Sequence, residues 1–166
     1  TFDETIQTYL RPTAKPSQVR TILESLAATT PQHDTRCAAT FHEIAERIPS
    51  RGLIIVISDF FDDAEAIKNA LHHFRFKHHE LVVFHLMAEE ELTFPFDKFD
   101  DFRCLEVEGR RLNIDPATIR ASYLDRVQAH LKSIELACGQ MQADYVPIST
   151  RTPVTEALFS YFSQRK

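Results

Sequence analysis

Glycine is scarce in this sequence: the 166 residues include only Gly52, Gly109 and Gly139. Isolated glycines cannot form GxGxxG, GxxxxGKS/T or GxSxG, so the motifs of dinucleotide binding, of a P-loop and of a nucleophile elbow are missing. The three cysteines are odd in number and far apart, which indicates neither a disulfide framework nor a CxxC metal site. This cysteine usage favours a reducing, cytoplasmic location.

Basic stripes and long apolar runs are missing as well. A net charge of -5 without clustered lysine and arginine argues against nucleic acid or an anionic membrane as the main partner. No apolar run approaches the roughly 18 residues of a spanning helix, and no signal pattern opens the sequence, so we expect no membrane contact from this segment. With 43% hydrophobic and 26% charged residues, the composition is typical of one soluble globular domain over residues 1–166.

Two aliphatic runs without alternation dominate the middle of the sequence. They cover residues 53–57 and 80–87, and a helical pattern over 63–77 separates them. Continuous apolar runs are typical of strands covered on both faces of a parallel sheet, and a strand, helix, strand order of this length indicates a βαβ unit. We therefore predict the α/β fold class, with a three-layer, mainly parallel sheet between helices.

Apolar residues at helical spacing predict further helices around this unit. Two of them precede the first strand, over 17–29 and 34–48, and a last helix follows Thr152. A long helix follows Asp115 and Pro116, which suit the N-cap and the first helical position. Alternation on both sides of the Glu-Gly pair at 108–109 predicts a β-hairpin over 103–114, and Pro147 predicts an edge position for the strand at 145–148.

Ser58 and Asp59 end the first aliphatic run, at the kind of position where ligands bind in open α/β sheets. A carboxylate there needs backbone N–H groups or a cation as partners. Mg²⁺ binds carboxylates, hydroxyls and waters, and Ser58 supplies a nearby hydroxyl. The alternative is that Asp59 caps the following helix or turn, and the stretch taken alone favours that alternative.

A second acidic cluster follows the second aliphatic run at Glu89, Glu90 and Glu91. Two acidic clusters at neighbouring strand ends could share a metal ion for phosphoryl chemistry. The competing functional class is therefore a Mg²⁺-dependent phosphohydrolase that uses Asp59, Asp63 and Glu89. A charged loop at the rim of the sheet is the commoner explanation of such a cluster.

Histidines form an HHx4HH pattern at residues 72–73 and 78–79. The pattern could bind a transition metal, but adjacent histidines point to different sides of a helix, and we favour a solvated helix end. His85 stands inside the second aliphatic run, where we expect a hydrogen-bonded histidine of the core.

The segment LTFPFDKFDDF, residues 92–102, interleaves phenylalanines with acids. A loop so rich in phenylalanine is either buried or used for docking. We favour packing of Phe94 and Phe96 under the hairpin, and we keep a protein contact as the second option.

Three motifs in this order carry a family resemblance: RGLIIVISDFFDD, ELTFPFD and NIDP. Together they resemble the C-terminal part of the bacterial domain-of-unknown-function family numbered 58, a relative of von Willebrand factor A domains with a Rossmann-like fold. The opening TFDETIQTYLRP is similar to the end of the second strand, a turn and the short third strand of that family. The resemblance thus covers nearly the whole chain and implies that the N-terminal strands of the fold are missing from it.

The resemblance implies a metal-ion-dependent adhesion site built from three loops. Its first loop, DxSxS, has no match here, its second is matched by Thr35, and its third is matched by Asp59 with Ser58. We therefore expect an incomplete site, with Mg²⁺ in the intact protein and low occupancy in this chain.

The resemblance also implies a non-enzymatic protein-binding role with a MoxR-type AAA+ ATPase. Asp62, Asp63, Phe94 and Phe96 are the candidate protein-binding residues. In the family order the missing first strand lies beside the strand at 53–57, so we expect an exposed edge there that supports a homodimer or a domain swap.

Overall fold

The computed structural model describes residues 1–2, 5–30, 37–97, 100–103 and 111–164. Three parallel strands form the main sheet in the order β1-β2-β5, with β1 at Leu53–Ser58, β2 at Glu80–Met87 and β5 at Asp144–Ser149. β1 and β2 pair from Leu53↔Glu80 to Ser58↔His85, which brings their carboxyl ends together. The predicted α/β class with a parallel sheet is confirmed, and Pro147 lies in an edge strand as predicted.

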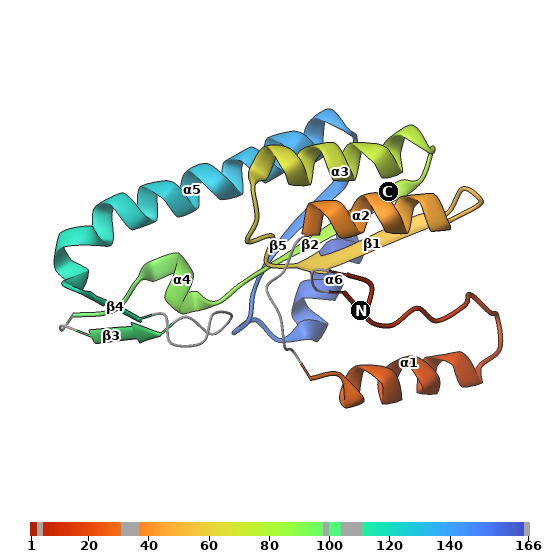
Figure 1. Cartoon of the computed structure of the whole chain (residues 1–166), viewed down its shortest axis with the longest axis horizontal. Helices are drawn as coiled ribbons and strands as arrows, with labels where there is room; N and C mark the ends of the chain where they lie inside the picture. The colour runs from red at the N-terminus through yellow and green to blue at the C-terminus, as the bar shows by residue number, and fades with distance from the viewer. Residues whose placement is uncertain (3–4, 31–36, 98–99, 104–110, 165–166) are drawn as a thin grey trace.

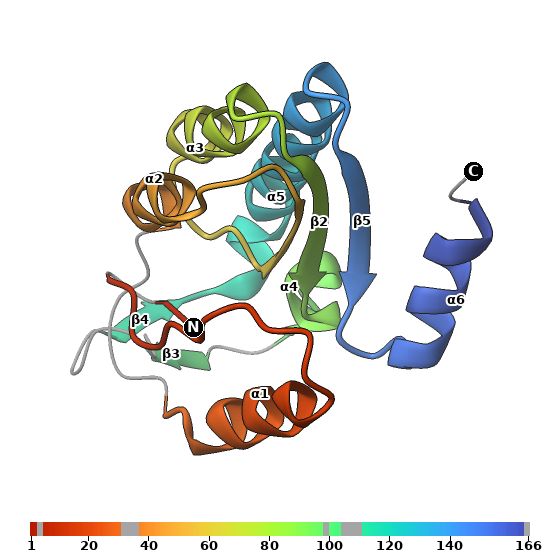
Figure 2. The same cartoon turned by 90° about the vertical axis from the view of Figure 1, so that its right-hand side faces the viewer.

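Helices lie on both sides of this sheet (Figure 2). One side carries α2 (Cys37–Arg47), α3 (Ala64–Phe76) and α5 (Pro116–Gln140), and the other side carries α6 (Val154–Gln164). The core lies under the three helices, where Phe41, Ile67 and Phe74 pack with Val83 of β2 and Ile134 of α5. On the opposite face, Tyr161 of α6 packs against Phe84 with the ring centroids 5.6 Å apart.

A small hairpin and a short helix extend the carboxyl end of the sheet (Figure 1). The short helix is α4 (Glu89–Thr93), and the hairpin pairs β3 (Asp100–Arg103) with β4 (Arg111–Ile114) in antiparallel register. A hairpin is present as predicted, and its second strand lies in the predicted range, but its first strand begins at Asp100 and not at residue 103. The predicted turn at residues 108–109 lies outside the described residues. The predicted cap of the long helix is also confirmed, because the Asp115 side chain accepts a hydrogen bond from the backbone N–H of Ala117 at 3.0 Å.

β1 departs from the prediction that both of its faces are covered. Ile54 and Val56 face the core, but Leu53, Ile55 and Ile57 on the other face are 47%, 52% and 59% exposed. The reason is that α6 covers this face only over β2 and β5. β2, in contrast, is buried along most of its length on both faces, as predicted.

The first helix, α1 (Ser17–Ala28), forms over the predicted range but buries none of its residues. The sequence places an apolar stripe on it, but none of its residues is buried, and the helix lies apart from the sheet in both views (Figures 1 and 2). The stripe consists of Val19, Ile22, Leu23 and Leu26, all of which are exposed. Two apolar surfaces, on β1 and on α1, are therefore exposed in the part of the chain that the structure describes. Among the described helices, none is long and apolar enough to cross a bilayer.

Candidate functional site

Asp59 follows the last residue of β1, at the carboxyl edge of the sheet. Its Oδ1 atom accepts a hydrogen bond from the backbone N–H of Phe61 at 3.3 Å, while the Ser58 hydroxyl accepts one from the N–H of Phe60 at 3.1 Å. The Asp59 side chain is exposed, and within the described ranges its Oδ2 atom has no hydrogen-bond partner. The carboxylate therefore faces solvent with one oxygen available for a ligand.

The backbone at Phe60 has a left-handed conformation, with φ of 53°. Such a conformation is uncommon for a bulky residue and requires support from its surroundings. The Phe60 ring is fully buried and makes edge contacts with the rings of Phe41 and His85, at centroid distances of 6.3 and 5.1 Å. The loop thus buries a phenylalanine beside an exposed aspartate.

Two histidines from other elements contact the carbonyl groups of this loop. His85 of β2 has its Nε2 atom 2.9 Å from the carbonyl oxygen of Asp59, and His130 of α5 has its Nε2 atom 3.0 Å from that of Phe60. The Nδ1 atom of His85 lies 3.0 Å from the Tyr145 hydroxyl. Burial lowers the pKa of His85 and raises the pKa of Tyr145 to about 12, which keeps the imidazole neutral and the phenol protonated at neutral pH. The prediction of a hydrogen-bonded core histidine at position 85 is confirmed.

Asp62 connects the loop to the start of α2. Its Oδ2 atom accepts a hydrogen bond from the backbone N–H of Ala38 at 3.4 Å, and its Oδ1 atom accepts one from the N–H of Asp63 at 2.7 Å. The predicted second loop of the site, with Thr35, precedes α2 directly, but Thr35 lies outside the described residues. The contact of Asp62 with Ala38 nevertheless brings the first turn of α2 to the loop that carries Asp59.

Asp63 has a clear local role as the N-cap of α3. Its Oδ1 atom accepts a hydrogen bond from the backbone N–H of Ala66 at 2.8 Å. A side-chain oxygen in this position satisfies one of the unpaired N–H groups of the first helical turn. The sequence offered capping of the following helix or turn as the alternative for Asp59: the helix cap belongs to Asp63, whereas Asp59 caps the turn after β1 by accepting the Phe61 N–H.

The acidic cluster after β2 forms the first turn of α4 and makes local contacts. Glu89 accepts a hydrogen bond from the Ser149 hydroxyl at 3.2 Å, and Glu91 accepts one from the backbone N–H of Ala88 at 2.7 Å. The pKa of Glu90 is lowered first by a hydrogen bond from its own backbone and then by its contact with Arg151, with which it forms a salt bridge. These contacts tie α4 to the end of β5, and in the described part of the chain no three His, Cys, Asp or Glu side chains form a metal-binding group.

The histidine pattern at residues 72–73 and 78–79, which spans the end of α3, is only partly a solvated helix end. His79 is 1% exposed and accepts a hydrogen bond from the N–H of Gly52, which is a packing role that the sequence did not indicate. His73 pairs with Glu46 of α2 at 2.8 Å, and Lys77 pairs with the same carboxylate at 3.1 Å. The side-chain hydrogen bond of Lys77 is the main cause of the lowered pKa of Glu46. These contacts join α2 to α3.

Phe94 belongs to a buried aromatic cluster near the hairpin. It is 5% exposed, and its ring lies 5.1 Å from that of Phe96, 6.0 Å from that of Phe102 and 4.5 Å from that of Tyr123. The packing that the sequence favoured for Phe94 is what the structure shows. A docking role for the half-buried Phe96 stays a prediction.

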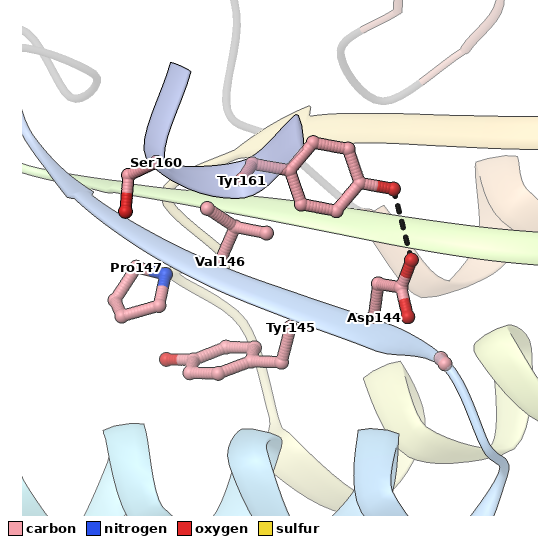
Figure 3. A pocket seen from close by; sticks show the side chains of 7 residues that line it. Asp144, Tyr145, Val146, Pro147, Ser160 and Tyr161 are labelled. Atoms are coloured by element: carbon pink, nitrogen blue, oxygen red, sulfur yellow. Dashed lines mark hydrogen bonds between the residues drawn. The ribbon is translucent and has the colours of Figure 1, made fainter. Parts of the chain in front are cut away.

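A separate open pocket of about 570 Å³ lies between β5 and α6 (Figure 3). Tyr161 reaches across Val146 and donates a hydrogen bond to Asp144 at 2.8 Å along one wall of this pocket. No sequence pattern indicated this pocket, because its wall combines residues 143–147 with residues 160–161. The pocket shares no lining residue with the Asp59 loop.

Comparison with known families identifies the chain at the family level. The model of the family described as "Protein of unknown function DUF58" matches residues 1–133. The chain belongs to this family. The matched part of this DUF58 chain includes β1, the Asp59 loop, the hairpin and most of α5. No curated protein and no solved structure matched the sequence.

Proposed function

We propose that this DUF58 chain is a non-enzymatic protein-interaction domain whose partner contacts the carboxyl end of β1. The observation that carries the proposal is the state of Asp59, whose main chain is bonded to the core while its carboxylate faces solvent. An exposed, fixed acid of this kind is suited to a cationic group of a partner or to a metal ion shared with it. Asp62 and the first turn of α2 extend the same surface.

The fold type that we propose is von Willebrand factor A-like, within the broader Rossmann-like architecture. The parallel sheet with helices on both sides and the acid at a strand end support this proposal. The motifs RGLIIVISDFFDD, ELTFPFD and NIDP add the family resemblance. In that fold type the loop of Asp59 would be the third loop of a metal-ion-dependent adhesion site.

The described residues alone do not make a Mg²⁺ site. Mg²⁺ requires about six oxygen ligands in near-octahedral geometry, whereas this loop offers the Asp59 carboxylate and the Ser58 hydroxyl, which already accepts the Phe60 N–H. Further ligands would have to come from Thr35, from other parts of the intact protein or from an acid of the partner. We therefore propose Mg²⁺ as a bridging ion of the assembled site, with low occupancy in this chain alone.

The partner that we propose is a MoxR-type AAA+ ATPase, on the strength of the family resemblance. A cytoplasmic location, which the cysteine usage favours, is part of the same proposal. The competing class, a phosphohydrolase with Asp59, Asp63 and Glu89, is less well supported. Each of its three acids has a structural partner, since Asp59 accepts the Phe61 N–H, Asp63 caps α3 and Glu89 accepts a hydrogen bond from Ser149. In the part of the chain that the structure describes, they do not form a metal-binding group.

The test is the affinity of the purified chain for a purified MoxR-type ATPase in the presence of Mg²⁺. We expect Asp59→Ala to weaken binding by about tenfold or more, as truncation of a central charged contact does. Asp125→Ala is the matched control, because Asp125 is an exposed aspartate on α5, and it should leave the affinity unchanged. Turnover of a phosphoester such as para-nitrophenyl phosphate that disappears in Asp59→Ala would instead establish the phosphohydrolase.

A further inference from the structure

We propose that His85 and His130 are positioning residues, which hold the Asp59-Phe60 backbone in the conformation that turns the Asp59 carboxylate outward. This inference rests on the proposed function, because it assumes that Asp59 is the binding group. Its basis is that two consecutive carbonyl oxygens, of Asp59 and Phe60, each lie within hydrogen-bond distance of an imidazole Nε2 atom. The two imidazoles belong to different elements, β2 and α5, so the loop is fixed from two directions.

The chemistry of the partners fixes the tautomer of both rings. A carbonyl oxygen can only accept a hydrogen bond, so the Nε2 atoms of His85 and His130 must carry hydrogen and donate it. The Nδ1 atom of His85 is then an acceptor, and the protonated hydroxyl of Tyr145 at 3.0 Å is its donor. His85 is thereby satisfied at both nitrogens although it is completely buried.

A role beyond packing follows from the polarity of these side chains. An imidazole inside an apolar strand costs free energy unless both of its nitrogens are paired, whereas an aliphatic residue would fill the same position without that cost. What the imidazole adds is a hydrogen bond to the Asp59 carbonyl, and a left-handed residue follows directly at Phe60. The second histidine bonds the carbonyl of that left-handed residue itself.

The orientation of the carboxylate is the consequence. With its carbonyl held toward His85 in the core, Asp59 directs its side chain to solvent, where Oδ1 accepts the N–H of Phe61. Loss of either imidazole donor would free the peptide and weaken the preference for this one orientation. The two histidines would therefore determine how well Asp59 is preorganised for a partner.

Histidine-ring ¹⁵N spectra of the full chain test the tautomer assignment without any ligand. We expect the Nε2 atom of both rings to carry hydrogen at pH 7.5 and the Nδ1 atom of His85 to be an acceptor. A ring whose Nε2 atom carries no hydrogen would overturn the proposal. Tyr145→Phe should shift the ring resonances of His85 and leave those of His130 unchanged. His85 resonances that stay unchanged in this variant would also count against the proposal.

Two variants of His130 separate positioning from bulk packing. His130→Leu removes the donor, and we expect the Phe61 amide to exchange about two- to tenfold faster and the Asp59 carboxyl ¹³C resonance to shift. His130→Gln keeps an N–H donor. It should restore the exchange rate of the Phe61 amide to within about twofold of the wild-type rate and return the Asp59 carboxyl resonance toward its wild-type position. Equal effects of the two variants, or no effect of His130→Leu in a folded protein, would refute the positioning role.

Affinity for the MoxR-type ATPase distinguishes a failure of this inference from a failure of the proposed function. If Asp59→Ala abolishes binding while His130→Leu leaves the loop signals unchanged, the positioning role is refuted and the proposed function stands. If His130→Leu shifts the loop signals and Asp59→Ala leaves binding intact, the positioning role stands and the proposed function is refuted.

Discussion

The Nε2 atom of His85 lies 2.9 Å from the carbonyl oxygen of Asp59, which joins the centre of the sheet to the residue that follows β1. His85 and Ser58 are register partners in adjacent parallel strands, so the contact crosses from β2 to the loop just beyond β1. Asp59 consequently combines an exposed carboxylate with a main chain that is anchored in the core. Its Oδ1 atom accepts the local Phe61 N–H, much as Asp63 and Glu89 accept local hydrogen bonds, but among these three acids it is Asp59 whose carbonyl group is bonded to a buried histidine.

Replacement of Phe94 by alanine should destabilise the protein strongly. The ring is buried among three other aromatic rings, and removal of a buried phenylalanine costs about 3 to 5 kcal/mol of unfolding free energy. Urea unfolding followed by circular dichroism measures this cost. Phe159→Ala is the control, because Phe159 is exposed on α6 and its loss should change stability by no more than about 0.5 kcal/mol. A folded Phe94→Ala protein of normal stability that fails to bind its partner would support docking instead.

Asp63 should contribute to stability through its cap on α3. We expect Asp63→Ala to lower the unfolding free energy by about 0.5 to 2 kcal/mol, since the Ala66 N–H loses its acceptor. Asp63→Ser, which restores an N-cap oxygen, should recover most of this loss in thermal unfolding. Equal stability of Asp63→Ala and the wild type would remove the structural role and return Asp63 to the list of binding candidates.

Alkaline pH should destabilise the fold through Cys138. Burial raises the pKa of this thiol from 9.0 to about 11, so between these values the unfolded state releases its proton and the folded state does not. The protonated thiol thus contributes to the unfolding free energy. Its contribution is fully present below pH 9 and is lost as the pH rises toward 11, and for a shift of this size the total loss is about 3 kcal/mol. Tyr145 acts in the same direction at higher pH, because burial raises its pKa to about 12.

Unfolding free energies at pH 8, 9, 10 and 11 provide the measurement for this prediction. Between pH 8 and pH 11 the unfolding free energy should fall by less in Cys138→Ala than in the wild type. This difference in slope does not depend on how much the substitution itself destabilises the protein. Parallel curves for the two proteins would show that the thiol does not titrate differently in the folded state.

The exposed edge of β1 should support self-association at high protein concentration. Ile55 and Ile57 are more than half exposed on a strand whose far edge has no partner strand among the described residues. Such an edge favours pairing with another chain, as a dimer or by a domain swap. We expect Ile55→Lys to raise the dissociation constant by about tenfold or more, because it removes a buried aliphatic group and adds a charge at the edge. Leu136→Lys, on the exposed side of α5, is the control, and a wild type that stays monomeric in light scattering at high concentration would contradict the prediction.

Sequence patterns predicted the elements of this fold well where the chain packs against itself. Apolar spacing located α2, α3 and α5, and the Asp115-Pro116 pair located the start of α5. The same spacing located α1 and β1, but α1 and one face of β1 are left exposed, because an apolar stripe shows that a surface suits burial and not that something covers it. The exposed edge of β1 was predicted instead from the family resemblance.

The site could be predicted only in part. The position of Asp59 followed from the end of an aliphatic run, and His85 followed from its place inside another. The role of His130 could not be found, because it depends on the meeting of α5 with a loop 70 residues earlier in the chain. The cap at Asp63 was also missed, since SDFFDD offers three aspartates and only the backbone decides which one begins the helix.

The most direct measurement is the footprint of the MoxR-type ATPase on the chain, recorded as amide resonance changes of the ¹⁵N-labelled protein in the presence of Mg²⁺. We expect the largest resonance changes on residues 58–63 and on the first turn of α2, and we expect Asp59→Ala to reduce them. Changes that gather instead on the pocket between β5 and α6, or on the exposed side of α5, with residues 58–63 undisturbed, would contradict it.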